Sequence, residues 1–104
     1  MILLQINFPF PAAYMGEALS RNARTLAESI NHEPGFISKV WIENTESEES
    51  GGIYLFTDTA SAQNYLAMHR TRLATMGVTT LSWKLFHVNQ PLSEINRGFP
   101  KESS

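Results

Sequence analysis

The sequence predicts an α+β fold with the element order β-α-β-β-α-β. Four short apolar segments have the pattern of strands, and two longer segments carry apolar residues at helical spacing. A polar, acidic stretch separates the second and third strands, as the turn of a hairpin would. This order is the split βαβ, or ferredoxin-like, pattern, a four-stranded antiparallel sheet with two helices on one face. The 104 residues fit one domain, placed at residues 1–96, with a tail at residues 97–104.

The first strand and the first helix fill the N-terminal third of the chain. Residues 2–8 alternate with the two-residue period of a strand, which Pro9 and Pro11 end. Residues 14–30 repeat apolar side chains at steps of three and four, which predicts one amphipathic helix. Residues 33–35, Glu-Pro-Gly, stop that helix, because proline lacks an amide hydrogen and glycine accepts a turn conformation.

A hairpin follows. Residues 36–43 predict the second strand, and residues 53–56, which are preceded by Gly51 and Gly52, predict the third. Residues 44–50 between them have no apolar side chain to bury, so they predict an exposed loop. The three glutamates of this loop are expected to be solvated and not to bind a metal ion.

The second helix and the fourth strand complete the domain. Asp58 is placed to cap the helix and Gly77 to end it. The buried stripe of this helix is predicted to comprise Ala62, Tyr65, Leu66, His69, Leu73 and Met76. Residues 78–88 predict the fourth strand. Beyond Pro91, the apolar residues of the tail are expected to dock on another surface, with Leu92 and Ile95 within reach of a partner subunit.

Both faces of the predicted sheet are apolar, although the helices can cover only one. On the second strand Ile37 and Trp41 are expected on one face, opposed by Phe36, Val40 and Ile42. The third and fourth strands likewise carry large apolar residues in both registers. A face without helices needs another cover, which predicts a homodimer packed sheet to sheet as a dimeric α/β barrel.

Composition narrows the class of protein. The formal net charge is -2 and the isoelectric point is about 5.9, which argues against a nucleic-acid partner. The sequence has no cysteine, so disulfides and thiolate metal sites are excluded. No membrane-length apolar run or targeting signal is present, which favours a cytoplasmic protein. Nucleotide and flavin motifs are absent as well.

Eight side chains could do chemistry from within apolar segments: Asn7, Trp41, Tyr54, Tyr65, His69, Arg72, Trp83 and His87. His69 could be a base near neutral pH or a hydrogen-bonded core residue. His87 shares its side of the fourth strand with Trp83 and could line a site. Asn7 is costly in a core unless it meets a ligand or a partner. The rings of Trp41, Tyr54 and Trp83 suit either a ligand pocket or a dimer core.

Several stretches of the chain resemble the YdhR monooxygenase family. They are residues 26–31, 33–36, 39–41, 51–58, 88–89 and 91–96, and the likeness runs in one register from the first strand to Asn96. That family is similar to the antibiotic biosynthesis monooxygenases of the dimeric α/β-barrel superfamily. The resemblance therefore implies the same fold and dimer that the patterns predict.

The resemblance also implies an activity. Related oxygenases act on polycyclic phenols such as anthrones with O2 as co-substrate and without flavin, haem or metal. The protein then supplies a binding pocket, a proton acceptor and donors for an oxyanion. By position, His69 would be the base, Arg72 and Tyr54 would stabilise the anion, and Trp41 would stack on an aromatic substrate.

Three other functions stay open. Haem-degrading enzymes of this superfamily use an asparagine on strand one, a tryptophan and a helix-two histidine. Asn7 and His69 match two of these, but Thr59 stands where the tryptophan is expected. A non-catalytic ligand-binding or stress-response barrel, and an isomerase or dehydratase of small metabolites, are the remaining alternatives.

Overall fold

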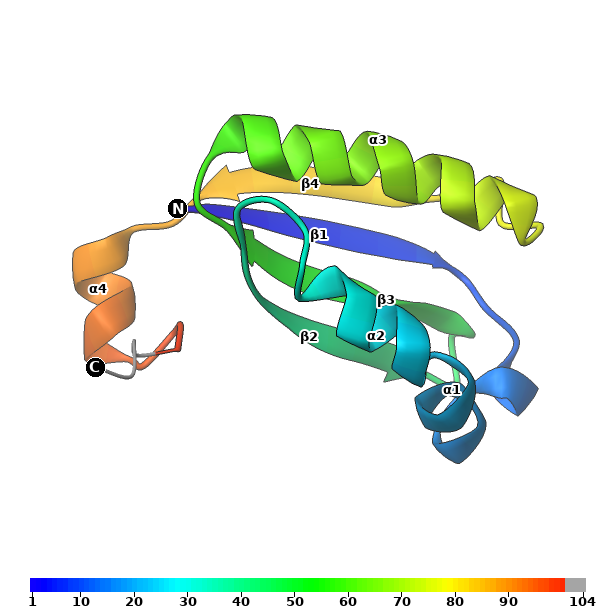
Figure 1. Ribbon diagram of the computed structural model, residues 1–104. Coiled ribbons are helices and arrows are strands. Elements are labelled where there is room, and N and C mark those ends of the chain that lie inside the picture. The colour runs from blue at the N-terminus through cyan, green and yellow to red at the C-terminus, as the bar shows by residue number, and fades with distance from the viewer. Residues whose placement is uncertain (101–104) are drawn as a thin grey trace.

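The structure is a computed structural model that describes residues 1–100. Its strands form one antiparallel sheet in the order β2-β3-β1-β4. They are β1 (Ile2–Pro9), β2 (Phe36–Asn44), β3 (Glu49–Phe56) and β4 (Ser82–His87). The predicted ferredoxin-like α+β fold is confirmed (Figure 1).

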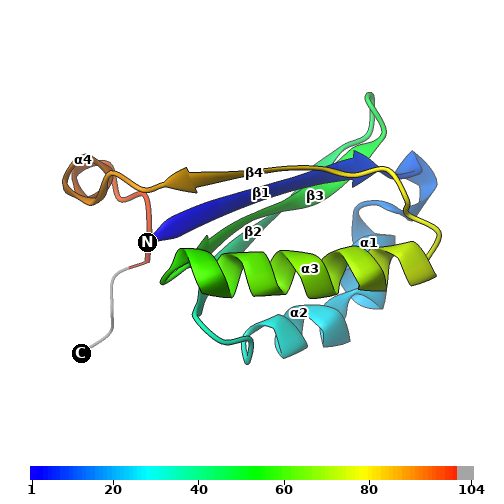
Figure 2. The same cartoon turned by 90° about the horizontal axis from the view of Figure 1, so that it is seen from above.

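The main helices lie on one face of this sheet. They are α1 (Glu17–Asn22), α2 (Arg24–Ile30) and α3 (Thr59–Thr75), and the view from above shows them on the same side (Figure 2). The 3-10 helix η1 (Ala12–Tyr14) and the helix α4 (Gln90–Ile95) are short additions. Within residues 1–100, no helix combines the length and the apolar character needed to cross a membrane.

The core lies between the sheet and α3. Leu4, Ile6 and Phe56 are fully buried there, and they pack against Tyr65 and Ala62 of α3. Burying large apolar side chains between a sheet and a helix supplies most of the drive for such a fold. The alternate residues of β1 therefore point to the helices, as their two-residue period predicts.

The first helix is not the single helix predicted over residues 14–30. It is divided at Ala23, whose backbone φ of -97° and ψ of 5° depart from helical values. Hydrogen bonds continue from Ala23 N to Leu19 O and from Ala27 N to Ala23 O, yet the axis changes, and α1 turns across the end of the sheet (Figure 1). Periodicity predicts which residues are buried, but it does not detect a bend that keeps the same face inward.

The strand boundaries also differ from the prediction. β4 starts at Ser82 and not at Val78, because its neighbour β1 pairs with it only as far as Asn7. β3 starts earlier than predicted, at Glu49, because β1 and β2 both pair with it through the two glycines. Partner strands, which the local sequence does not reveal, decide where a strand ends.

A bulge in β2 places Phe36 on the opposite face of the sheet from the one that the sequence predicts. The register shifts between Phe36 and Ser38, so Phe36 faces the helices and meets the ring of Phe56, with centroids 6.0 Å apart. Phe36 therefore shares its face with Trp41 and does not oppose it. An extra residue in one strand reverses the alternation on one side of the bulge.

Both predicted caps of the long helix are confirmed. The Asp58 carboxylate accepts a hydrogen bond of 2.8 Å from the Ser61 amide. At the other end Gly77 has a φ of 88°, and the amides of Gly77 and Val78 donate to the carbonyls of Ala74 and Leu73. The helix that carries His69 and Arg72 is therefore fixed at both ends.

The opposite face of the sheet has no helix over it. Val40 and Phe86 on this face are 62% and 48% exposed, and Leu3 and Ile53 are partly buried beside them. The strand pairing aligns Leu3 with Phe86 and Val40 with Ile53. These side chains give the uncovered face an apolar part, as the sequence predicts, although Gln5 and Asn7 lie on the same face. The homodimer that would cover it remains a prediction.

The chain leaves the sheet through α4, which was not predicted. Asn89 caps it by accepting a hydrogen bond of 3.2 Å from the Leu92 amide, and Pro91 lies in its first turn. Leu92 and Ile95 are 61% and 72% exposed, and α4 lies beyond the end of the sheet (Figure 1). Part of the predicted tail, residues 101–104, lies outside the described residues.

Candidate active site

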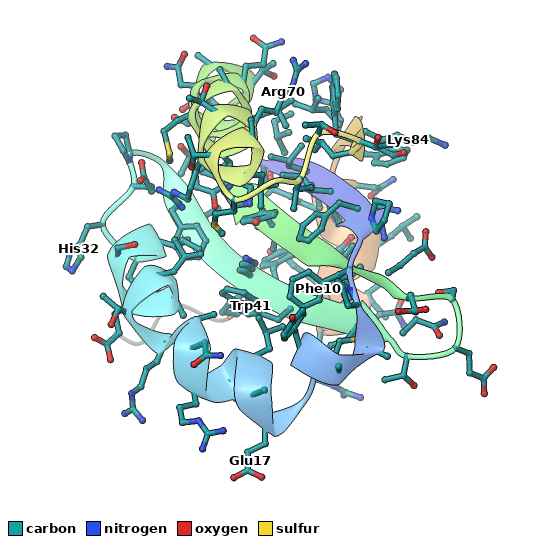
Figure 3. The ribbon with its side chains drawn as sticks, turned by 90° about the vertical axis from the view of Figure 1, so that its right-hand side faces the viewer. Phe10, Glu17, His32, Trp41, Arg70 and Lys84 are labelled. Atoms are coloured by element: carbon teal, nitrogen blue, oxygen red, sulfur yellow. The ribbon has the colours of Figure 1, made fainter. Side chains whose placement is uncertain are left out.

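A cavity of about 440 Å³ lies between the helices and the end of the sheet where β1 stops. Its walls are mostly apolar and include Phe8, Phe10, Leu26 and Leu73. Asn22 and Ser50 line it too, together with five larger side chains that carry polar atoms: Lys39, Trp41, Tyr54, His69 and Arg72. Figure 3 shows Trp41 and Phe10 between the sheet and the first helices, while His32 points away from them. The cavity is large enough for a small aromatic molecule.

Strand alternation and helical spacing bring these five side chains together. Lys39 and Trp41 are two residues apart on β2 and so share its helix-facing side. Tyr54 is the cross-strand partner of Lys39 on β3. His69 and Arg72 are three residues apart on α3 and so lie on one side of that helix. Four of the five are residues that the sequence analysis placed around a ligand.

An aromatic stack supports the cavity from behind. The rings of Tyr65 and His69 are stacked with centroids 5.2 Å apart, and the ring of Tyr54 lies 5.0 Å from that of Tyr65. The hydroxyls of Tyr54 and Tyr65 are 3.5 Å apart, a long hydrogen bond. Tyr65 is buried in the core and does not line the cavity. It holds the orientation of the two rings that do.

His69 is neutral in this environment. Only 4% of its surface is exposed, and its Nδ1 atom has no hydrogen-bond partner among residues 1–100. Burial, with Lys39 and Arg72 nearby, lowers the pKa of His69 to about 4. The imidazole therefore keeps a free lone pair at neutral pH, which is the form that a proton acceptor requires.

Arg72 and Tyr54 can both donate hydrogen bonds. One terminal nitrogen of Arg72, Nη2, lies 3.0 Å from the sulfur of Met68. The other, Nη1, is buried without a partner among residues 1–100. Burial raises the pKa of Tyr54 above its ordinary value, so the phenol stays protonated. A buried guanidinium nitrogen without an acceptor is costly, and a ligand oxygen would relieve that cost.

Lys39 is the charged cavity residue that the sequence analysis missed. Its Nζ atom lies 3.3 Å from the centroid of the Trp41 ring and 4.6 Å from that of Tyr54. Burial, and to a smaller extent the charge of Arg72, lowers the pKa of Lys39 to about 7. A lysine two residues from Trp41 on an otherwise apolar strand was the available clue, because alternation puts both on one face.

Gly52 makes room for Lys39 and Tyr54. A Cβ atom on Gly52 would lie 2.6 Å from Cε of Lys39 and 2.9 Å from the ring of Tyr54, closer than nonbonded carbons approach. Because Gly52 has no side chain, the stem of Lys39 can pass over β3 at this point. The glycine thus positions the amine, although it breaks the apolar pattern of the strand.

Three other candidate residues lie elsewhere. Asn7 belongs to the face without helices, and its side-chain oxygen accepts a hydrogen bond of 3.0 Å from Gln5. Trp83 lies between β4 and α3, with the Arg70 guanidinium 4.5 Å from its ring centroid. His87 is exposed at the end of β4. Because Asn7 and His69 are on opposite sides of the sheet, the structure does not join the two residues that match the haem pattern.

The comparisons agree with this architecture. Residues 3–99 match a family model described as "Putative mono-oxygenase ydhR". No curated protein sequence gives a match. Within residues 1–100, no three His, Cys, Asp or Glu side chains form a group that could hold a metal ion.

Two solved structures are similar in fold. A "putative antibiotic biosynthesis monooxygenase" from Deinococcus radiodurans aligns with a TM-score of 0.62 and 13% identity, over 86% of this chain and 93% of that one. A point mutant of SnoaB, a cofactor-independent oxygenase from Streptomyces nogalater, aligns with a TM-score of 0.59 and 17% identity, over the same shares of the two chains.

Proposed function

The chain belongs to the ydhR mono-oxygenase family, and from this premise we propose that it is a cofactor-independent monooxygenase that oxidises an aromatic phenolic molecule with O2. One observation carries the proposal. A single apolar cavity gathers a stacking ring, a phenol donor, a neutral imidazole and a guanidinium, from Trp41, Tyr54, His69 and Arg72. This set matches the needs of a reaction in which the substrate supplies its own electrons.

The steps follow from the residues. His69 accepts a proton from the activated carbon of the substrate, which leaves a delocalised carbanion. Arg72 and Tyr54 donate hydrogen bonds to the oxygen on which the charge gathers. The carbanion reduces O2: one oxygen atom stays on the carbon as a carbonyl, and the other leaves as water with the two hydrogens of the former methylene group. The apolar walls keep bulk water from the carbanion.

Oxygen uptake tests the proposal. The purified, metal-free protein should consume O2 with some member of a panel of anthrones, hydroquinones and hydroxylated polycyclics, without flavin or NAD(P)H. His69→Ala should lower kcat by roughly 100-fold or more, the usual loss when a general base is removed. His32→Ala is the matched control, because His32 is exposed and absent from the cavity.

Two outcomes would count against it. Uptake that is unchanged in His69→Ala would remove His69 as the base. If the same aromatics bind but no member of the panel consumes oxygen, the protein is better described as a ligand-binding module or as an isomerase or dehydratase.

The proposal includes a homodimer. The apolar face that carries Val40 and Phe86 is the side of the sheet away from the cavity, so a second copy can cover it without closing the site. Exposed apolar patches of this kind are typical of interfaces between copies. The proposed partners are therefore a second copy of the chain and an aromatic small molecule, in a cytoplasmic protein.

A further inference from the structure

The cavity holds two cationic side chains and no carboxylate. Lys39 comes from β2 and Arg72 from α3, and both line the same space. The only ion pair among residues 1–100 joins Arg24 to Glu28, at an exposed position. Neither cavity cation therefore has an acidic partner. Buried charges are normally paired, and an unpaired one is costly.

The nearest acidic residue on the same side of β2 is occupied elsewhere. Glu43 follows Trp41 on the helix-facing side, but its Oε2 atom accepts a hydrogen bond of 2.8 Å from the Gly16 amide. It is exposed and lies outside the cavity lining. The remaining charged or titratable groups that line the cavity are Tyr54 and His69, and neither carries a negative charge at neutral pH.

Internal contacts satisfy the two cations only in part. The Lys39 ammonium faces the rings of Trp41 and Tyr54, which offsets some of its desolvation. The rings accept no conventional hydrogen bond, and Nη1 of Arg72 has no acceptor among residues 1–100. A negatively charged oxygen placed between the two cations would supply the missing acceptor and the missing charge.

We propose that Lys39 and Arg72 form an anion-binding site within the cavity and that the natural ligand is an aromatic molecule with an ionised oxygen, as a carboxylate or a phenolate, next to its ring. The ring lies along Trp41 and the apolar wall. This inference rests on the proposed function for the use of the cavity, and it adds the charge of the ligand and a role for Lys39.

Lys39 also couples binding to pH. Its pKa is about 7 in the free protein, so near pH 8 most molecules carry a neutral amine. An anion beside it favours the charged form. Binding should therefore take up a proton at pH 8, and affinity for an anion should fall as the pH rises through 7.

The test uses three naphthalene probes and the full chain. They are 2-naphthoate, its neutral methyl ester and 2-naphthol, with dissociation constants measured at pH 7 by calorimetry. We expect 2-naphthoate to bind at least about tenfold more tightly than the ester, as a charge-assisted contact in an apolar site allows. If the site binds phenolates, a separate signal is expected. The 2-naphthol would bind in its ionised form, and its absorption would shift to longer wavelength.

Variants assign the effect to Lys39. Lys39→Met keeps the aliphatic stem and should clearly reduce the preference for the acid, to what Arg72 alone supports, while leaving ester binding unchanged. Lys39→Arg should retain the preference. Lys84→Met is the matched control, because Lys84 is exposed on β4 and points away from the helices (Figure 3), and it should behave as the wild type.

The outcomes separate this inference from the proposed function. Equal affinities of the wild type for acid and ester, with no ionised naphthol, would overturn the anion site even if oxygen uptake is found. Equal weakening of both probes by Lys39→Met would also overturn it. A preference for the anion that depends on Lys39 would establish the site even if no substrate consumes oxygen. Calorimetry of the wild type at pH 8, in two buffers of different ionisation enthalpy, should show proton uptake and needs no variant.

Discussion

The Nζ atom of Lys39 lies 3.3 Å from the centroid of the Trp41 ring, on the side of β2 that faces the helices. The contact places a cation against the aromatic wall of a largely apolar cavity. A cation there is desolvated, and the ring repays only part of the cost. The fold tolerates this arrangement at a site suited to binding, where strained or unsatisfied groups are commonly found.

Replacing Lys39 with methionine should stabilise the protein most at acidic pH. The pKa is about 7 in the folded chain and about 10.5 in the unfolded one, so between these values the unfolded state binds more protons. The lysine's contribution to the free energy of unfolding therefore rises with pH across that window. Urea denaturation should show a gain of about 1 to 3 kcal/mol for Lys39→Met at pH 6. The gain should shrink towards pH 10, and an equal gain at both pH values would contradict the assignment.

His69 should weaken the fold as the pH falls below 6.5. Its pKa is about 4 in the folded protein against 6.5 when unfolded, so the unfolded state takes up the proton first and stability is lost between these values. His69→Gln should remove roughly 1 to 3 kcal/mol of the wild-type loss between pH 6.5 and 4. His32→Gln, at an exposed position, should leave the profile unchanged. Nitrogen chemical shifts that show His69 protonated at pH 6 would refute this prediction.

Gly52→Ala should destabilise the protein and disturb the cavity. The added methyl group would press on the Lys39 stem and the Tyr54 ring, and overpacking of this kind costs about 1 to 3 kcal/mol. The Lys39 stem can move but the Tyr54 ring is buried, so a Gly52→Ala/Lys39→Ala double variant should recover part of the loss. Thermal unfolding of the two single variants and the double variant measures the coupling. Strict additivity would mean that the methyl group does not reach Lys39.

Phe86→Glu should weaken the proposed dimer and leave the monomer folded. Phe86 is 48% exposed on the uncovered face, where a carboxylate is solvated in a monomer but buried in a sheet-to-sheet dimer. Sedimentation of the wild type should give a mass of twice 11.7 kDa. For Phe86→Glu, the same measurement should give a dimer dissociation constant that is higher by about 100-fold or more. Tyr14→Ser alters an exposed ring on η1 and should not change it. A wild-type monomer at micromolar concentration would disprove the dimer.

The sequence by itself determined the element order, the capped helix of His69 and Arg72, and the presence of large apolar residues on both faces of the sheet. These features follow from local periodicity and capping chemistry, which operate within a few residues. It also placed Trp41, Tyr54, His69 and Arg72 around a ligand, through the likeness to a family and not through spacing.

Only the tertiary structure decided which polar residues meet. It showed that the side of β1 that carries Asn7 is the one without helices, and it left Trp83 and His87 outside the cavity. It also added Lys39, whose stem passes over β3 at Gly52. The bend at Ala23 and the bulge after Phe36 likewise depend on what packs against them. Side chains from β2, β3 and α3 converge because strands pair and a helix packs across them. Such contacts join residues far apart in the chain, and no local pattern encodes them.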